Sequence, residues 1–271
     1  AAIGGIDALF LINQPTAWQG IANPPARLAA GQSPSRAYKL ALEPGDCDGT
    51  LRRSMSKHAR KKMTTKRNRF AEFGPSELVQ AHSDAEIERV LDAFLAQKAA
   101  RFAQLGLPDP FATPAIRAFL RDGALAQAGR SPAIELYSLD LSGRSVATYV
   151  GAVQGKRFSG MATSFDLGSE AARTSPGEIL LIELIKRKCR AGVTMFDLGV
   201  GEARYKTTIC DDSDELVDTF VPLTAKGRAY AGYSQAKRAL KRRIKASPLA
   251  LKTAQRVLGL LRRRKPAEAD E

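Results

Sequence analysis

Residues 194–206 read Thr-Met-Phe-Asp-Leu-Gly-Val-Gly-Glu-Ala-Arg-Tyr-Lys, and they combine a strand, a turn and three reactive side chains. Apolar residues before Asp197 favour a short strand, and the two glycines after it favour a tight turn. Tyr205 and Lys206 follow that turn directly. A carboxylate, a phenol and an amine are therefore expected close together at the end of one strand.

The segment before this strand indicates a helix. Ser175-Pro176-Gly177-Glu178 precedes an apolar pattern at helical spacing over residues 179–190, and Ala191-Gly192 ends it. Serine suits the N-cap, proline the first turn and glutamate the positive end of the helix dipole. Because the N-terminus of a helix can bind an anion, Ser175 is either a simple cap or part of an anion site.

Length and composition predict a globular chain. It has 271 residues, 44% of them hydrophobic, which allows one large domain or two smaller ones. The first residues have neither a basic region nor an apolar core, so we expect no signal peptide and suspect a fragment that lacks an upstream part. No apolar run reaches the roughly 18 residues of a membrane span, so we expect a soluble or peripheral protein.

The cysteines and histidines are few. Cys47, Cys189 and Cys210 are odd in number and far apart, which argues against a disulfide framework and against a zinc ribbon. His58 and His82 form no paired-histidine motif. We therefore expect no metal cofactor.

Positive charge is concentrated in two segments. The net charge is +14, with nine Lys or Arg in residues 51–69, fourteen in residues 226–265 and no acid in either. A basic helix is often only a solvated surface, but it can also meet phosphates. Leu and Val opposite the basic residues of the second segment favour an interfacial helix on an anionic membrane. The phosphate candidates in the first segment are Arg52, Arg53, Lys57, Arg60, Lys61 and Lys62.

The hydrophobic periodicity predicts a mixed α/β fold. Strands are expected at residues 8–12, 37–42, 77–81, 133–139, 145–154, 157–163, from 194 and at 216–222. Helices are expected at residues 51–70, 83–105, 113–128, 175–190 and through much of 226–264. Three strands form an antiparallel meander, and the helix at 175 carries the chain to the strand at 194.

This order of elements, with Thr174-Ser175-Pro176-Gly177-Glu178-Ile179-Leu180-Leu181, Phe196-Asp197-Leu198-Gly199-Val200-Gly201 and Tyr205-Lys206, resembles a known group. It is similar to the bacterial GNAT-type acyltransferases of cellulose and exopolysaccharide biosynthesis, which are related to Fem-type aminoacyl transferases. The resemblance implies a GNAT-like acyltransferase fold at 75–225 and a remnant of a second GNAT-like half at 1–50. A basic connecting helix at 51–74 and a basic amphipathic tail at 226–271 complete this division.

The resemblance also implies roles for individual residues. Gly160 permits close approach of the donor. Tyr205 either protonates a leaving thiolate or is packed with its hydroxyl satisfied. Asp197 either acts on the acceptor amine or only caps the glycine turn. The candidate residues are catalytic Asp197 and Tyr205; donor-binding Gly160, Arg173, Ser175, Gly177 and Glu178; and acceptor-binding Glu135, Tyr137, Tyr149 and Lys206.

The segment 168–177 departs from the usual GNAT loop, Gln/Arg-x-x-Gly-x-Gly/Ala, which wraps a coenzyme A pyrophosphate. This departure counts against acetyl-CoA as the donor, although Arg173 and the amides of residues 175–178 could still contact a phosphate. The expected enzyme is an acyltransferase that uses acetyl-CoA or another acyl-CoA on a small or glycan-linked acceptor. We expect it in the cytoplasm, peripheral to the inner membrane through its basic tail. The alternatives are a Fem-like transferase that uses aminoacyl-tRNA, in which the basic helix binds RNA, and a non-catalytic basic binding module.

Overall fold

The computed structural model describes residues 5–125 and 131–246. The strands are β1 (Ala8–Pro15), β2 (Ala17–Trp18), β3 (Ile21–Ala22), β4 (Ala29–Ala41), β5 (Ser76–Gln80), β6 (Glu135–Leu141), β7 (Arg144–Gln154), β8 (Arg157–Phe165), β9 (Met195–Val200) and β10 (Asp212–Pro222). The α-helices are α1 (Cys47–Ser54), α2 (Lys57–Ala71), α3 (Asp84–Leu105), α4 (Pro114–Ala124), α5 (Pro176–Arg190), α6 (Arg204–Ile209) and α7 (Ala225–Ala246). Two 3-10 segments, η1 (Pro24–Leu28) and η2 (Glu170–Thr174), complete the mixed α/β fold expected from the sequence.

The chain forms two compact units. Among the described residues, the larger unit takes 38–125, 131–199 and 203–212, and the smaller unit takes 5–37, 200–202 and 213–246. The pattern of the sequence instead places boundaries near residues 50, 74 and 225. This difference arises because β1 and β10, which lie at opposite ends of the chain, pair with each other in the smaller unit.

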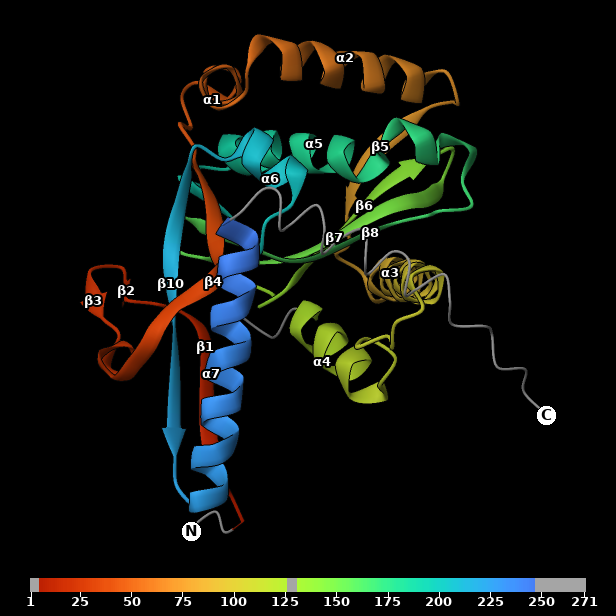
Figure 1. Ribbon diagram of the computed structural model, residues 1–271. Coiled ribbons are helices and arrows are strands. Elements are labelled where there is room, and N and C mark those ends of the chain that lie inside the picture. The colour runs from red at the N-terminus through yellow and green to blue at the C-terminus, as the bar shows by residue number, and fades with distance from the viewer. Residues whose placement is uncertain (1–4, 126–130, 247–271) are drawn as a thin grey trace, which may run out of the picture. The chain divides into compact units, whose positions relative to one another are not determined.

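The larger unit is layered around a sheet with the order β9-β8-β7-β6-β5 (Figure 1). The strands β5 to β8 are antiparallel neighbours, whereas β8 and β9 run parallel. Helix α5 covers one face, and α3 with α4 covers the other, while α1 and α2 lie on the outer side of α5. The meander and the helix that joins it to the strand at 194 are thus as predicted.

Local sequence signals explain where the helices begin and end. Ser83 and Glu86 form a reciprocal capping box at the start of α3, and the amides of Ser83 and His82 lower the pKa of the Glu86 carboxyl to about 2. Gly106 ends this helix in the left-handed conformation. The single helix predicted over 51–70 is wrong, because Met55 is extended and Ser56 caps a separate helix, α2.

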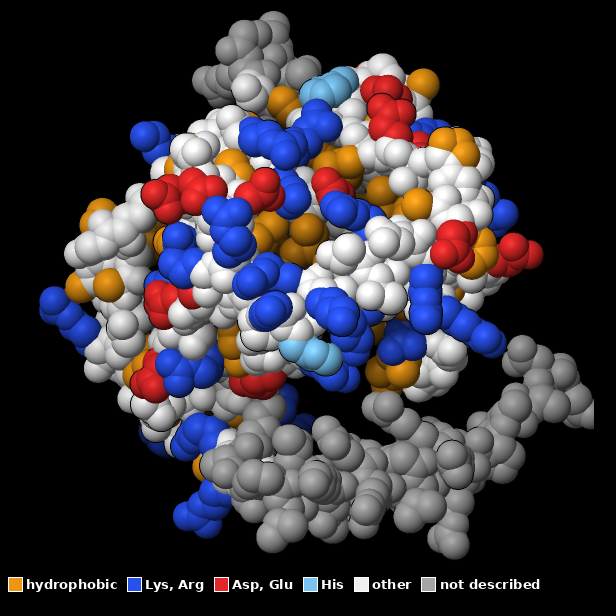
Figure 2. Space-filling view, turned by 90° about the horizontal axis from the view of Figure 1, so that it is seen from above, with side chains coloured by type: hydrophobic (Ala, Val, Ile, Leu, Met, Phe, Trp, Pro, Cys, Tyr) orange, Lys and Arg blue, Asp and Glu red, His pale blue; other side chains and the backbone are white. Residues whose placement is uncertain are grey.

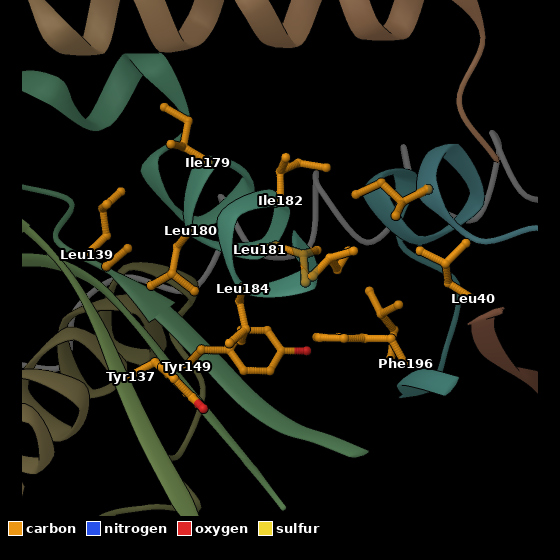
Figure 3. Close-up of a cluster of buried hydrophobic side chains, with 14 of the residues drawn as sticks. Leu40, Tyr137, Leu139, Tyr149, Ile179, Leu180, Leu181, Ile182, Leu184 and Phe196 are labelled. Carbon is orange, nitrogen blue, oxygen red and sulfur yellow. The ribbon is translucent and has the colours of Figure 1, made fainter. Parts of the chain in front are cut away.

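Apolar side chains fill both faces of this sheet. On the α5 side, Leu180 and Leu184 lie over Tyr149 (Figure 3), and Phe158 and Phe196 belong to the same buried cluster. A second cluster packs beneath α3 and α4 on the other face. Helix α5 is buried along most of its length, since α1 and α2 cover its outer side. The strand ends and the N-terminus of α5 are therefore held by a packed core.

Cys47 and Cys189 form a disulfide, with Cα atoms 5.8 Å apart and 142 residues of sequence separation. The expectation against a disulfide framework therefore misses this bond. The bond joins the start of α1 to the end of α5, and only the tertiary packing of α1 on α5 brings the two sulfurs together. Cys210 is the free cysteine.

The smaller unit is built on β1, β10 and the first part of β4, with α7 packed against β1. Strands β1 and β10 are antiparallel, with an irregularity between Leu11 and Gln14. There the Asn13 amide donates to buried Asp218, and Arg238 of α7 pairs with the same carboxylate. The basic tail predicted from residue 226 is helical as far as Ala246, and its amphipathic second half lies outside the described residues.

Candidate functional site

Strands β8 and β9 separate at the centre of the larger unit. Their parallel pairing covers residues 157–159 against 195–197, although β8 continues to Phe165 and β9 to Val200. On its other edge β8 contains a register shift, because Gly160 pairs with Gly151 while Ala162 pairs with Val150. The extra residue of β8 comes two positions after Ser159, the last residue of β8 that pairs with β9.

Close backbone approach defines this point of divergence. A Cβ added at Gly160 would lie 2.1 Å from the Tyr149 hydroxyl oxygen, so only glycine fits there. Gly199 has a φ of +73°, and its added Cβ would lie 3.4 Å from the Gly160 carbonyl oxygen. The buried Lys206 ammonium donates to the Gly199 carbonyl at 3.1 Å. Lys206 thus supports the turn after β9, and substrate binding by it stays a prediction.

Asp197 has partners for both of its oxygens. Oδ2 pairs with Nη2 of Arg157 at 2.7 Å, and Oδ1 accepts from the Gly199 amide at 2.8 Å. The second contact is the cap of the glycine turn, one of the two roles expected for Asp197. The carboxylate therefore holds β8, β9 and the glycine turn in one geometry.

Tyr205, in the first turn of α6, lies near Tyr149 and Cys210. Burial raises the pKa of the Tyr205 hydroxyl, and the neighbouring Cys210 adds to the shift. Burial also raises the pKa of the Cys210 thiol to about 12, with Asp211 and Asp197 adding to the rise and Lys206 opposing it. Both groups therefore stay protonated at neutral pH, and a protonated phenol can act as an acid.

A cavity of about 840 Å³ lies between α2, the N-terminus of α5 and α6, and Tyr205 is one of its walls. Lys66 of α2 pairs with Glu178 at 2.6 Å between Nζ and Oε2. Ser175 occupies the N-cap position with a φ of +63°, and its side chain makes no capping hydrogen bond. The site side chains that line the cavity are His58, Lys62, Lys66, Arg173, Ser175, Glu178, Arg204 and Tyr205. This basic cavity suits a phosphorylated ligand.

The expected site residues thus gather in two places joined by Tyr205. Gly160, Asp197, Lys206 and Tyr149 lie at the divergence of β8 and β9. Arg173, Ser175 and Glu178 line the cavity, and Gly177 stands in the first turn of α5, beside Phe165 at the end of β8. Sequence reasoning missed Lys66, Arg204 and His58 as site residues. The acid-free run of residues 51–69 contains two of these three, but only the packing of α2 beside α5 shows which side chains face the cavity.

Glu135 and Tyr137 do not line this cavity. Tyr137 is fully buried and donates to Glu135 at 2.9 Å, and Glu135 pairs with buried Lys188. Burial, with the Glu135 charge adding to it, raises the pKa of the Tyr137 hydroxyl. Tyr149 is opposite Tyr137 in the sheet register and is buried with it (Figure 3). Inside the core Glu135 and Tyr137 have their own partners, and acceptor binding by these three residues stays a prediction.

In the part of the chain that the structure describes, no group of three or more His, Cys, Asp or Glu side chains is arranged to hold a metal ion. Among the described helices, none has the length and apolar character needed to cross a membrane.

Comparison with solved structures gives distant similarities. The chain is similar to the C-terminal domain (DUF2156) of a putative lysylphosphatidylglycerol synthetase from Agrobacterium fabrum, at 10% identity and a TM-score of 0.49, covering 74% of this chain and 63% of that one. It is similar to a conserved protein of unknown function from Bacteroides thetaiotaomicron, at 14% identity and a TM-score of 0.48, covering 81% and 64%. A GCN5-related N-acetyltransferase from Kribbella flavida matches at 14% identity and a TM-score of 0.40, covering 80% and 68%. The chain thus spans less than two thirds of the first two of these structures.

Among curated proteins, none matches the chain. Comparison with models of protein families, in contrast, assigns the chain to a family. The family described as acetyltransferase (GNAT) domain matches residues 57–207, which run from α2 through the meander and α5 to α6. Because this match spans more than half of the sequence, the chain belongs to the acetyltransferase (GNAT) domain family.

Proposed function

We propose that this chain is an acyltransferase, which moves an acyl group from an acyl-CoA to an amine or hydroxyl of a small or glycan-linked acceptor. The observation that carries the proposal is the basic cavity of about 840 Å³ that runs from the N-terminus of α5 to Tyr205. A diphosphate needs several positive charges, and Lys62, Arg173 and Arg204 supply them from three different elements. The donor's phosphates would lie against these side chains, with its thioester toward Tyr205 and Gly160.

The unusual segment before α5 is consistent with this arrangement. In place of a glycine-rich loop, residues 170–174 form a short 3-10 helix that uses its own polar groups: the Ser169 side chain caps it, and Thr174 donates to the Ala171 carbonyl. Fewer backbone amides are therefore available to bind an anion than in a glycine-rich loop. Basic side chains of α2 and α6 would instead supply much of the phosphate binding.

The proposed reaction uses two features of the site. The acceptor attacks the thioester carbonyl, the carbon–sulfur bond breaks, and the departing sulfur takes the proton of the Tyr205 hydroxyl. The acceptor loses its own proton to solvent, and solvent returns a proton to the Tyr205 oxygen. Asp197 keeps the diverging strands aligned through Arg157, so its part in the transfer is positional.

Donor binding tests the proposal directly. Isothermal titration of the full chain with acetyl-CoA should give saturable binding, and Arg173→Gln should weaken it roughly ten-fold, as expected for loss of one charge-assisted contact. The matched control is Lys61→Gln, which removes one positive charge from an exposed position of α2 outside the cavity. Equal losses in both variants, or no binding of any acyl-CoA, would contradict the proposal.

The acid-free surface of α2 favours a second candidate, transfer from an aminoacyl-tRNA. In that case the chain should retain RNA in a strongly salt-dependent way and ignore acetyl-CoA. The role in envelope polysaccharide or glycoconjugate synthesis, at the cytoplasmic side of the membrane, rests on the resemblance of residues 174–206. Assays with amine- and hydroxyl-bearing sugars as acceptors test that role.

A further inference from the structure

A second cavity, of about 300 Å³, lies on the other side of α2, between α1, α2 and α5. Its floor is apolar and is made by Leu51, Met55, Met63, Ile179 and Ile182. Figure 2 shows the outer face that α1 and α2 form, where Lys and Arg side chains gather around hydrophobic ones. We call this hollow the outer cavity. It combines an apolar floor with a charged rim.

The rim carries more positive than negative charge. Lys186 pairs with Asp48 at 3.1 Å, and Arg67 lies 3.8 Å from Glu183. Arg60 donates only to backbone carbonyls, at 2.8 Å to that of Arg52 and to that of Met55. Within residues 5–125 and 131–246 no carboxylate pairs with Arg60, so its charge is free to meet an anion.

Helix α2 extends this positive surface beyond the cavity. Seven of its 15 residues are Lys or Arg and none is acidic. In the described part of the chain, Lys66 and Arg67 form ion pairs, whereas Lys57, Lys61, Lys62 and Arg69 form none and all four are exposed. An isolated charged surface of this kind attracts polyanions of several classes.

We propose that the outer cavity binds an anionic phospholipid of a membrane surface, with its phosphate at Arg60 and apolar chain atoms on the methionine-containing floor. The floor decides between lipid and nucleic acid. It has no aromatic side chain on which a base could stack, and methionines adapt to flexible apolar chains. Apolar burial combined with basic side chains is the way interfacial segments bind anionic membranes.

A ligand in the outer cavity can affect the basic cavity next to Tyr205, because Met55 and Met63 line both cavities. A chain atom on the outer side would press on side chains that also face His58 and Lys66. We therefore expect lipid binding to alter the affinity for acetyl-CoA. The lipid site itself does not depend on the acyl-transfer proposal.

Thr64 and Thr65 provide a matched pair of positions for the test. Both are exposed on α2 and each donates to the carbonyl four residues earlier, at 3.1 Å, but only Thr64 lines the outer cavity. Thr64→Glu would place a carboxylate beside Arg60, and Thr65→Glu would place one beside Lys61. The two variants therefore have the same net charge, and in each the new carboxylate lies four residues after a basic residue of the same helix.

Co-sedimentation of the full chain with vesicles of phosphatidylcholine, with and without phosphatidic acid, measures binding. The chain and Thr65→Glu should bind the anionic vesicles, whereas Thr64→Glu should bind roughly five-fold or more weakly. Equal binding by the two variants, or equal binding to both vesicle types, overturns the proposal. Titration with short-chain phosphatidic acid and with glycerol 3-phosphate separates lipid from free phosphate. If the headgroup alone binds as tightly, or if only RNA binds, the lipid assignment is wrong.

Discussion

Asp197 of β9 and Arg157 of β8 form an ion pair at 2.7 Å, beside the last register position at which these two parallel strands are hydrogen-bonded. Their side chains are 15% and 19% exposed. The pair therefore joins the strands just before they separate, while Asp197 also accepts from the Gly199 amide in the following turn. One carboxylate therefore links β8, β9 and the glycine turn.

Replacing Asp197 tests this role. Asp197→Asn keeps an acceptor for the Gly199 amide but leaves Arg157 mostly buried without its ion-pair partner, so we expect a loss of about 2–4 kcal/mol in the free energy of unfolding. Asp166→Asn is the control, because Asp166 accepts from the amide two residues ahead and pairs at 3.5 Å with Arg144, whose side chain is 81% exposed. Urea denaturation should show a loss below about 1 kcal/mol for the control. Equal losses contradict a special role for Asp197.

Tyr205→Phe should slow transfer without weakening donor binding. Loss of a positioned acid costs roughly 100-fold or more in kcat, while the affinity for acetyl-CoA, carried by the basic side chains, should stay within about two-fold. Burial raises the pKa of the Tyr205 hydroxyl, so this group keeps its proton at every pH below the usual tyrosine pKa. The rate of the unchanged protein should therefore not fall in that pH range through ionisation of Tyr205. Release of free coenzyme A with time measures the rate. Tyr233→Phe, at an exposed tyrosine of α7, is the control.

Gly160 and Tyr149 form a close pair that can be tested by compensation. Gly160→Ala would place a Cβ 2.1 Å from the Tyr149 hydroxyl oxygen, so we expect a loss of about 1–3 kcal/mol in stability and a loss of donor binding. Tyr149→Phe removes that oxygen, and the nearest remaining ring atom would then lie 3.0 Å away. The double variant should recover part of the stability in thermal unfolding. No recovery would show that the hydroxyl is not the obstacle.

The disulfide predicts a thiol count. The unfolded chain should react with one equivalent of a thiol reagent before reduction and with three after it, because only Cys210 is free. The double variant Cys47→Ala/Cys189→Ala should lose about 2–4 kcal/mol of stability, since the bond closes a long loop in the unfolded chain. Mass spectrometry of unreduced peptides checks the pairing. Three reactive thiols before reduction would contradict it.

Cys210 should be a slow thiol in the folded protein. Its pKa is raised to about 12, mainly by burial, so little thiolate forms at neutral pH. Alkylation by iodoacetamide should accelerate about ten-fold per pH unit from pH 7 to pH 10 without a plateau. Lys206→Met removes the charge that opposes this shift and should slow the reaction further. Because the pKa of Cys210 is higher in the folded than in the unfolded chain, protonation of this thiol stabilises the folded state. This stabilisation is complete below the ordinary thiol pKa and declines as the pH rises toward 12.

Much of the larger unit follows from local signals in the sequence. The capping box at Ser83, the alternation of apolar residues in β6 to β8 and the glycine turns each specify an element without help from distant residues. The break at Ser56 was missed because the apolar stripe continues across it. Strand β4 was predicted only in its last part, because its first residues are rich in polar and small side chains.

The sequence by itself determined the order of elements, the family-like run from Ser175 to Lys206 and the concentration of positive charge. These properties depend on residues close together in the chain, where periodicity, capping and turn chemistry act. Only the tertiary structure decided that Lys66 faces Glu178, that Cys47 meets Cys189 and that Asp197 pairs with Arg157. Each of these contacts joins residues 40 or more positions apart. The packing of α1 and α2 on α5, and the divergence of two strands, bring such residues together, and no local pattern encodes that.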